Sequence, residues 1–429
     1  MIKVSFSLIL VLLFFSGCIG LSTPNSEHSN KKAFEKEDVY ILLALRAEQL
    51  KDYNSSSYLF NLLYENSSKK EYLYRSLQSD LSLQNNEKVV DRIDDILDDS
   101  LEDFSLVRIK IIALIQLQEY EKAKQLALNL VELSGIVDDY ILVSDIYVKL
   151  KKFDTAVKYL ESAYTIDYSE KILDKIAIIL YINLQREKDA IAQLETHSRM
   201  HGCSKLICSR LLGFYSNDNN VDGLLSTSLR LYEIYPSDDT IKRIIQIYSY
   251  KKDYVKLAEF LENSKYDDEL LLQLYSSSRD YKKALSLADK LYTRSGNIAY
   301  LAQSAIFEYE ISKDKSNKSM QKRVIDKLEK VLKVQETPLY LNYLGYLIID
   351  HEIDVKLGMD YVKKALKIEP NSAFYLDSLA WGYYKLGSCK KAYKIMKKVL
   401  SSDDGDDPDV LLHKKAIMKC IKQKKVNKK

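Results

Sequence analysis

The chain has 429 residues, and its 64 basic and 61 acidic side chains leave a formal net charge of +3. This balance gives no basic excess of the kind that nucleic-acid binding requires, so no nucleic-acid partner is predicted. Only 12 glycines and 5 prolines are present, whereas a doubly wound α/β enzyme uses more glycine in its turns; the composition therefore favours long helices.

The N-terminus has the pattern of an export signal. Lys3 is followed by the uncharged and mostly apolar stretch 4–15, which would rise only about 18 Å as a helix and is too short for a bilayer core of about 30 Å. We therefore predict a signal peptide over residues 1–17 rather than a permanent membrane span.

The end of this signal, Phe15-Ser16-Gly17-Cys18, resembles a bacterial lipobox, with Phe at the position that is commonly Leu. The resemblance implies that Cys18 is acylated and becomes the mature N-terminus, anchoring the protein to a membrane. Ile19 follows the cysteine, and for lipoproteins that lack Asp at this position the expected destination is the outer membrane, facing the periplasm. The alternative is ordinary cleavage with Cys18 incidental.

Residues 18–38 are rich in Ser, Asn and charged side chains and poor in apolar ones. Such a composition predicts a flexible tether between the lipidated cysteine and the folded body.

From about Val39 onward the sequence repeats. One position of each unit, within the second of two expected helices, recurs at steps of 33 or 34 residues, except for a step of 27 and a step of 40 that together make about two periods. The positions are Ser56, Val89, Ala123, Ala156, Ala190, Gly223, Leu257, Ala284, Val324, Gly358 and Ala392. This period predicts an all-α solenoid of helix pairs.

Two irregularities suggest how the body is divided. The step of 27 residues near Tyr266 implies shortened helices, and the turn 312–319 is long and charged. We predict an N-terminal arm over 39–263, a hinge over 264–319 and a C-terminal arm over 320–429.

Four cysteines lie in the body of the chain. Cys203 and Cys208 follow His197 and His201, a set that could form a zinc site, a disulfide or two free thiols. Export favours the disulfide, so no metal site is predicted. Cys389 and Cys420 lie 31 residues apart, nearly one repeat, and a second disulfide between them would hold the terminal helix.

The stretch Pro338–Asp404 repeats most clearly. Leu344-Gly345 followed by Gly358 matches Leu379-Ala380 followed by Ala392. The stretch resembles a pair of tetratricopeptide repeats (TPR), although Leu stands where the family often has Trp. The resemblance implies a right-handed solenoid of about eleven TPR-like helix pairs, whose first helices line a concave groove.

In this stretch, the TPR resemblance assigns five residues to the partner-binding groove: Asn342, Tyr346, Asp377, Trp381 and Tyr384. An exposed Trp beside Tyr and Asp suits peptide binding. The alternative is that Trp381 only packs against the neighbouring repeat.

The sequence contains no phosphate-binding loop, dinucleotide fingerprint, nucleophile elbow or HExxH motif, so we predict no catalytic residues, cofactor or small-molecule substrate. The favoured hypothesis is a membrane-anchored periplasmic lipoprotein that scaffolds an envelope protein assembly. The alternatives are a regulatory activator of a cell-wall synthesis enzyme and, in a third class, a metal-binding or catalytic protein that uses the His/Cys cluster.

Overall fold

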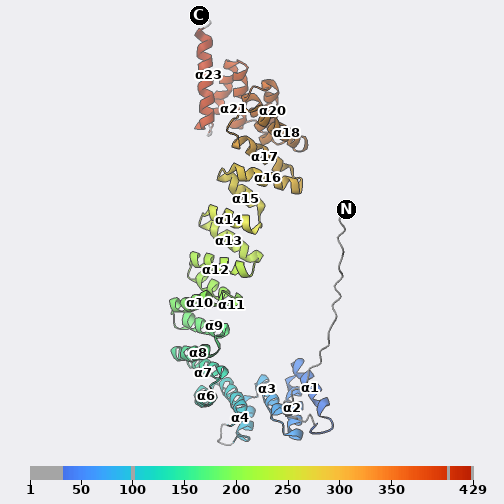
Figure 1. Cartoon of the computed structure of the whole chain (residues 1–429), viewed down its shortest axis with the longest axis vertical. Helices are drawn as coiled ribbons and strands as arrows, with labels where there is room; N and C mark the ends of the chain where they lie inside the picture. Colours follow the sequence, from blue (N-terminus) through green and yellow to red (C-terminus); the bar gives the residue numbers. More distant parts are fainter. Residues whose placement is uncertain (1–31, 98–101, 403–405, 427–429) are drawn as a thin grey trace, which may run out of the picture. The chain divides into compact units, whose positions relative to one another are not determined.

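The computed structural model describes residues 32–97, 102–402 and 406–426. The predicted signal peptide 1–17, the lipidation site Cys18 and the tether up to residue 31 lie outside the described residues. The chain divides into two units, one ending at Asp218 and one beginning at Asn219, and each is described by itself (Figure 1).

All regular structure in the described ranges is helical, as predicted. The helices of the first unit are α1 (Glu37–Gln49), α2 (Tyr53–Ser67), α3 (Lys70–Ser82), α4 (Asn86–Asp94), α5 (Phe104–Gln116), α6 (Tyr120–Ser134), α7 (Val137–Lys149), α8 (Phe153–Asp167), α9 (Glu170–Ile178) with its π-helical extension η1 (Ile179–Asn183), α10 (Glu187–His201) and α11 (Lys205–Asn217).

The second unit continues the same alternation. Its helices are α12 (Val221–Ile234), α13 (Asp238–Tyr250), α14 (Tyr254–Ser264), α15 (Asp268–Ser277), α16 (Tyr281–Ser295), α17 (Ile298–Ile311), α18 (Lys318–Val334), α19 (Pro338–Asp350), α20 (Val355–Ile368), α21 (Ala373–Lys385), α22 (Cys389–Val399) and α23 (Pro408–Val426). In chain order, the described helices form eleven pairs and a final helix, and the division between the units falls within the sixth pair.

The repeat is visible in the backbone of the turn inside the pairs. One residue of the turn has a left-handed conformation, with φ between 52° and 65°, at Lys51, Gln84, Gln118, Lys151, Gln185, Asn219, Lys252, Arg279, Glu352 and Gly387. In several turns the next amide bonds the carbonyl five residues earlier, as from Asp52 N to Ala47 O at 2.9 Å. This bond satisfies a carbonyl that the end of the helix would leave free.

The predicted small positions lie on the second helix of each pair, and ten of the eleven are buried; Gly223 is half-buried. The closest approach occurs between α19 and α20. A Cβ atom added to Gly345 would lie 2.7 Å from the carbonyl oxygen of Gly358, a distance that real Cβ atoms do not reach. Glycine is therefore required at this position.

Three local features lie near the predicted boundaries of the arms and the hinge. The ordered body begins before Val39, because Phe34 packs against the first core cluster and Glu37, at the start of α1, is buried. Near Tyr266 the helices α14 and α15 are short, at 11 and 10 residues, and residues 312–317 form the predicted long turn before α18. The hinge over 264–319 stays a prediction.

Candidate protein-interaction surface

Four of the five predicted groove residues come together in the second unit. Tyr346 lies on α19, while Asp377, Trp381 and Tyr384 lie on α21, the first helix of the next pair. The fifth, Asn342, does not join them, and its buried Oδ1 has no hydrogen-bond partner among the described residues.

A residue of α23 lies at the centre of this group. The side chain of His413 is 3% exposed, and its Nδ1 lies 2.8 Å from Oδ2 of Asp377. Its ring stacks on Trp381 with ring centres 4.1 Å apart, and its Nε2 lies 3.5 Å from the hydroxyl of Tyr346. The final helix thus covers the predicted groove in the last repeats.

The indole of Trp381 is half-buried and makes further polar and aromatic contacts within the chain. Its Nε1 donates a hydrogen bond of 2.8 Å to Oδ1 of Asp350, and Tyr384 stacks on the indole with ring centres 4.7 Å apart. Lys385 Nζ lies 5.2 Å from the ring centre, where a cation and an aromatic face attract each other. A peptide could stack on Trp381 only after α23 moves away.

His413 and Asp350 were missed by the sequence analysis. Both take part in the packing around Trp381, but α23 lies after the last repeat and carries no repeat signature. The one available signal was the position of His413 on the same helix as Cys420, which was already predicted to be joined to Cys389.

The structure places Cys389 and Cys420 within reach of a disulfide. Cys389 begins α22 and Cys420 lies on α23, with Cα atoms 6.0 Å apart. This separation falls inside the usual range for a disulfide. A bond here would tie the covering helix α23 to the α21–α22 pair.

The second cysteine pair joins the turn after α10 to the start of α11. The Cα atoms of Cys203 and Cys208 are 5.4 Å apart, and both side chains are buried. His197 is occupied elsewhere, because its Nδ1 lies 2.7 Å from the hydroxyl of Tyr164 and its Nε2 lies 3.3 Å from Glu170 Oε1. Within the described ranges, no group of three or more His, Cys, Asp and Glu side chains is arranged to hold a metal ion.

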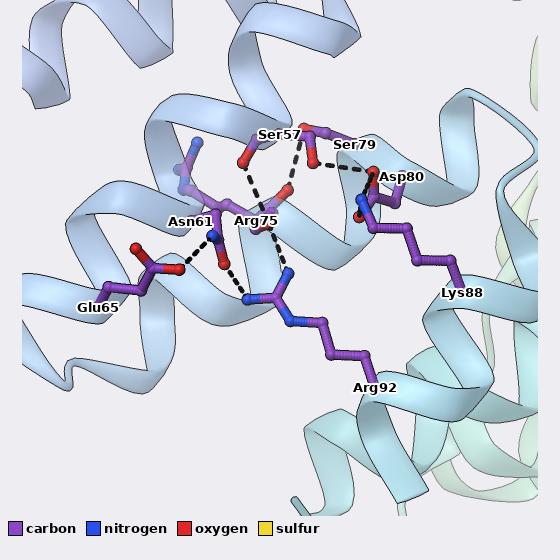
Figure 2. A network of polar contacts seen from close by, with 9 residues as sticks. Ser57, Asn61, Glu65, Arg75, Ser79, Asp80, Lys88 and Arg92 are labelled. Carbon is purple, nitrogen blue, oxygen red and sulfur yellow. Dashed lines mark hydrogen bonds and ion pairs between the residues drawn. The ribbon is translucent and has the colours of Figure 1, made fainter. Parts of the chain in front are cut away.

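A polar network in the first unit was also missed (Figure 2). Asp80 of α3 is 1% exposed; it accepts a 2.8 Å hydrogen bond from Ser57 of α2 and lies 3.1 Å from Lys88 Nζ of α4. Arg92 donates to Ser76 Oγ and Asn61 Oδ1. The sequence contained a signal of this network. Asp80 stands 34 residues, or one repeat, before Leu114, so it places a charged side chain at a position that is apolar in the next unit.

This network borders an open pocket of about 480 Å³ lined by α2, α3 and α4. Its lining includes the cations Lys88 and Arg92 and the anions Asp80 and Glu65, so the charged side chains of the lining cancel. Because these side chains already bond one another, the arrangement holds the first two helix pairs together and offers no evident catalytic group.

A pocket of about 490 Å³ lies on α14, α15 and α16, where the predicted N-terminal arm meets the predicted hinge. Lys283 pairs with Glu262 at 2.8 Å, and hydrogen bonds from Lys283 and Tyr275 lower the pKa of the Glu262 carboxyl. Lys265 and Lys290 also line the pocket and add positive charge.

No family model matches the sequence, and no curated protein matches it. The chain aligns with the crystal structure of the APC/C hetero-tetramer Cut9–Hcn1 at 13% identity over 91% of this chain and 87% of that chain, with a TM-score of 0.30. It aligns with MamA 41-end from Desulfovibrio magneticus RS-1 at 15% identity over 38% of this chain and 94% of that chain, with a TM-score of 0.33.

A tetratricopeptide repeat protein from Parabacteroides merdae ATCC 43184 aligns at 13% identity over 57% of this chain and 98% of that chain, with a TM-score of 0.26. At such low TM-scores these alignments carry no argument about function. Among the described residues, no helix has the length and apolar character needed to cross a bilayer.

Proposed function

We propose that this protein is a lipid-anchored envelope scaffold, which holds other proteins at the periplasmic face of the outer membrane and catalyses no reaction. Cys18 carries the anchor, residues 19–31 form the tether, and the helix pairs supply the binding surface. Stacked helix pairs offer long continuous surfaces, a form that suits protein partners better than small-molecule substrates.

The observation that carries this proposal is the placement of the five cysteines, four among the helices and one at the end of the predicted signal. Four of them form two cysteine pairs, Cys203 with Cys208 and Cys389 with Cys420. Their Cα separations of 5.4 Å and 6.0 Å suit disulfides, which persist in oxidising compartments. The fifth is Cys18, where the apolar signal ends. A lipoprotein of the envelope needs one cysteine for the anchor and can oxidise the rest, and this chain has that pattern.

The C-terminal groove is covered by α23, so a partner must either bind a different surface or displace this helix. Displacement costs the His413–Asp377 hydrogen bond and the stacking on Trp381. A partner that replaces α23 would therefore present an aromatic or imidazole ring to Trp381 and a donor to Asp377.

The test compares the wild-type protein with Cys18→Ser in the native bacterium. After an alkaline carbonate wash, which strips peripherally bound proteins, the wild type is expected to stay in the outer-membrane fraction. Cys18→Ser is expected in the soluble periplasm, in the wash, or as an unprocessed precursor. Fully processed Cys18→Ser that resists the wash contradicts the anchor.

Affinity capture from crosslinked cells then tests the scaffold. Several envelope proteins that co-purify as one assembly support it. Capture of a single cell-wall synthesis enzyme whose activity rises on binding supports the regulatory alternative. Recovery of the protein alone, from cells in which crosslinking is shown to work, contradicts both.

A further inference from the structure

The first helix, α1, is apolar on two opposite faces. Its inner face packs on α2 and α3 through Ala44, Ala47 and the buried Glu37. Its outer face exposes large aliphatic side chains at spacings of three, four and seven residues, which place them on one stripe of a helix. These residues are Val39, Leu42 and Leu43 of the helix and Leu50 directly after its last residue, each more than half exposed.

Polar contacts at the inner face fix which way this stripe points. Glu37 accepts hydrogen bonds from Lys69 Nζ at 2.6 Å and from the hydroxyl of Tyr72 at 2.9 Å, and the Lys69 bond is the main reason that the pKa of Glu37 is lowered. Nearer the other end of the helix, Arg75 bonds Glu48 at 2.7 Å. With both ends of the inner face held on α3, the aliphatic stripe faces away from the rest of the unit.

Such a stripe is unusual for the first helix of a repeat array. A terminal helix has a neighbour on one side only, and a polar outer face there keeps the array soluble. Four exposed aliphatic side chains gathered on one stripe form a patch of the kind that marks an interaction site.

We propose that the outer face of α1 lies in the interfacial layer of the phospholipid bilayer, with Leu42 and Leu50 among the acyl chains. The proposal rests on the lipid anchor at Cys18 proposed above. Residues 19–31 span at most about 45 Å when extended, so the anchored chain keeps α1 close to the membrane. A helix with one apolar face binds the interface in proportion to the apolar area that it buries.

The charges around the stripe specify the kind of lipid surface. Within α1 the cation Arg46 is outnumbered by the anions Glu37, Asp38 and Glu48, and the exposed Lys36 and Lys51 flank the helix. Because the helix carries no excess of positive charge, anionic headgroups are not required. The binding is therefore expected on neutral phosphatidylethanolamine–phosphatidylcholine vesicles, with little dependence on salt.

The test removes the anchor and keeps the helix. The chain from residue 18 onward with Cys18→Ser retains every described residue, and its flotation with neutral vesicles measures binding by the fold alone. Leu42 and Leu50 are 69% and 62% exposed, so Leu42→Ser with Leu50→Ser removes apolar area without disturbing the core. We expect this double variant to lower the partition coefficient by roughly tenfold or more.

The matched control changes two exposed aliphatic residues elsewhere in the same unit, Leu133→Ser with Ile166→Ser, which are 61% and 53% exposed. This pair should leave the partition unchanged. The proposal is overturned if the unanchored chain does not float with vesicles, or if both double variants lose binding equally. It is also overturned if Leu42→Ser with Leu50→Ser converts a dimer to a monomer in sedimentation without changing flotation, because α1 would then bind a second copy. Mass spectrometry of the N-terminal peptide of the wild type, which shows whether Cys18 carries acyl chains, tests the anchor separately.

Discussion

Replacing His413 with alanine should release α23 from the second unit. The imidazole is buried, bonds Asp377 at 2.8 Å and stacks on Trp381 at 4.1 Å. A hydrogen bond to a charged group contributes about 1.5–3 kcal/mol, and a stacked aromatic pair about 0.5–1.5 kcal/mol. We therefore expect His413→Ala to weaken the docking of α23 by roughly 3 kcal/mol, which is about two orders of magnitude in the docking equilibrium.

Hydrogen exchange followed by mass spectrometry measures this effect locally. Amides of α23 should exchange about a hundredfold faster in His413→Ala than in the wild type, when both are reduced so that Cys389 and Cys420 cannot hold the helix. The control is Leu412→Ala, one residue earlier on the same helix and 62% exposed, which should change the exchange by less than threefold.

The reasoning fails if α23 exchanges at the wild-type rate in reduced His413→Ala. A second variant separates the hydrogen bond from the ring contact. His413→Leu with Asp377→Leu replaces both polar partners by apolar ones, so it should restore much of the protection that the single variant loses. If the double variant exchanges as fast as His413→Ala, the buried carboxylate is not the source of the loss.

Two further predictions concern the packing and the pH dependence of the second unit. Gly345→Ala should destabilise the α19–α20 pair by about 1–3 kcal/mol because its Cβ meets the Gly358 carbonyl oxygen at 2.7 Å. The control is Gly213→Ala on α11 of the first unit, where an added Cβ atom meets no atom within 4 Å and should stabilise the exposed helix position by about 0.5–1 kcal/mol. Equal free energies of unfolding of the two variants in urea denaturation contradict this prediction. Burial lowers the pKa of His351, whose Nε2 lies 2.9 Å from the Tyr309 hydroxyl. The fold thus favours the neutral imidazole, so the contribution of His351 to the free energy of unfolding is complete above about pH 6.5. This contribution is lost as the pH falls toward the lower pKa of the folded state. His351→Gln should flatten the loss of stability between pH 7 and pH 5, and an equal loss in the variant would refute the assignment.

The fold was largely predictable because its rule is local. A small side chain is needed wherever two helices of a pair approach closely, and this need recurs every 33 or 34 residues. Ala123, Ala156 and Ala392 show it in the sequence and are fully buried in the structure. The shortened helices near Tyr266 were predictable for the same reason. A step of 27 residues is shorter than the period, so the helices within that step must contain fewer residues.

The candidate site was predictable only in part because its decisive contacts join segments that the repeat does not relate. Periodicity places Tyr346 and Trp381 on corresponding helices, and the structure brings them together. Periodicity cannot place His413 between them, because α23 is outside the repeat and the docking of α23 depends on tertiary packing. The hydrogen bond from Trp381 to Asp350 likewise depends on how α21 lies against α19, which spacing alone does not determine.

The two terminal helices solve the same physical problem in opposite ways. Each has a repeat on one side only, so each needs something to make its other side compatible with its surroundings. On α23 the outer side carries the exposed cations Lys415, Lys419 and Lys422, which water solvates well, beside the exposed Leu412. On α1 the outer side carries leucines such as Leu42, which water solvates poorly. A chain anchored through Cys18 would hold α1 beside a bilayer, and this setting accounts for the aliphatic outer side of α1.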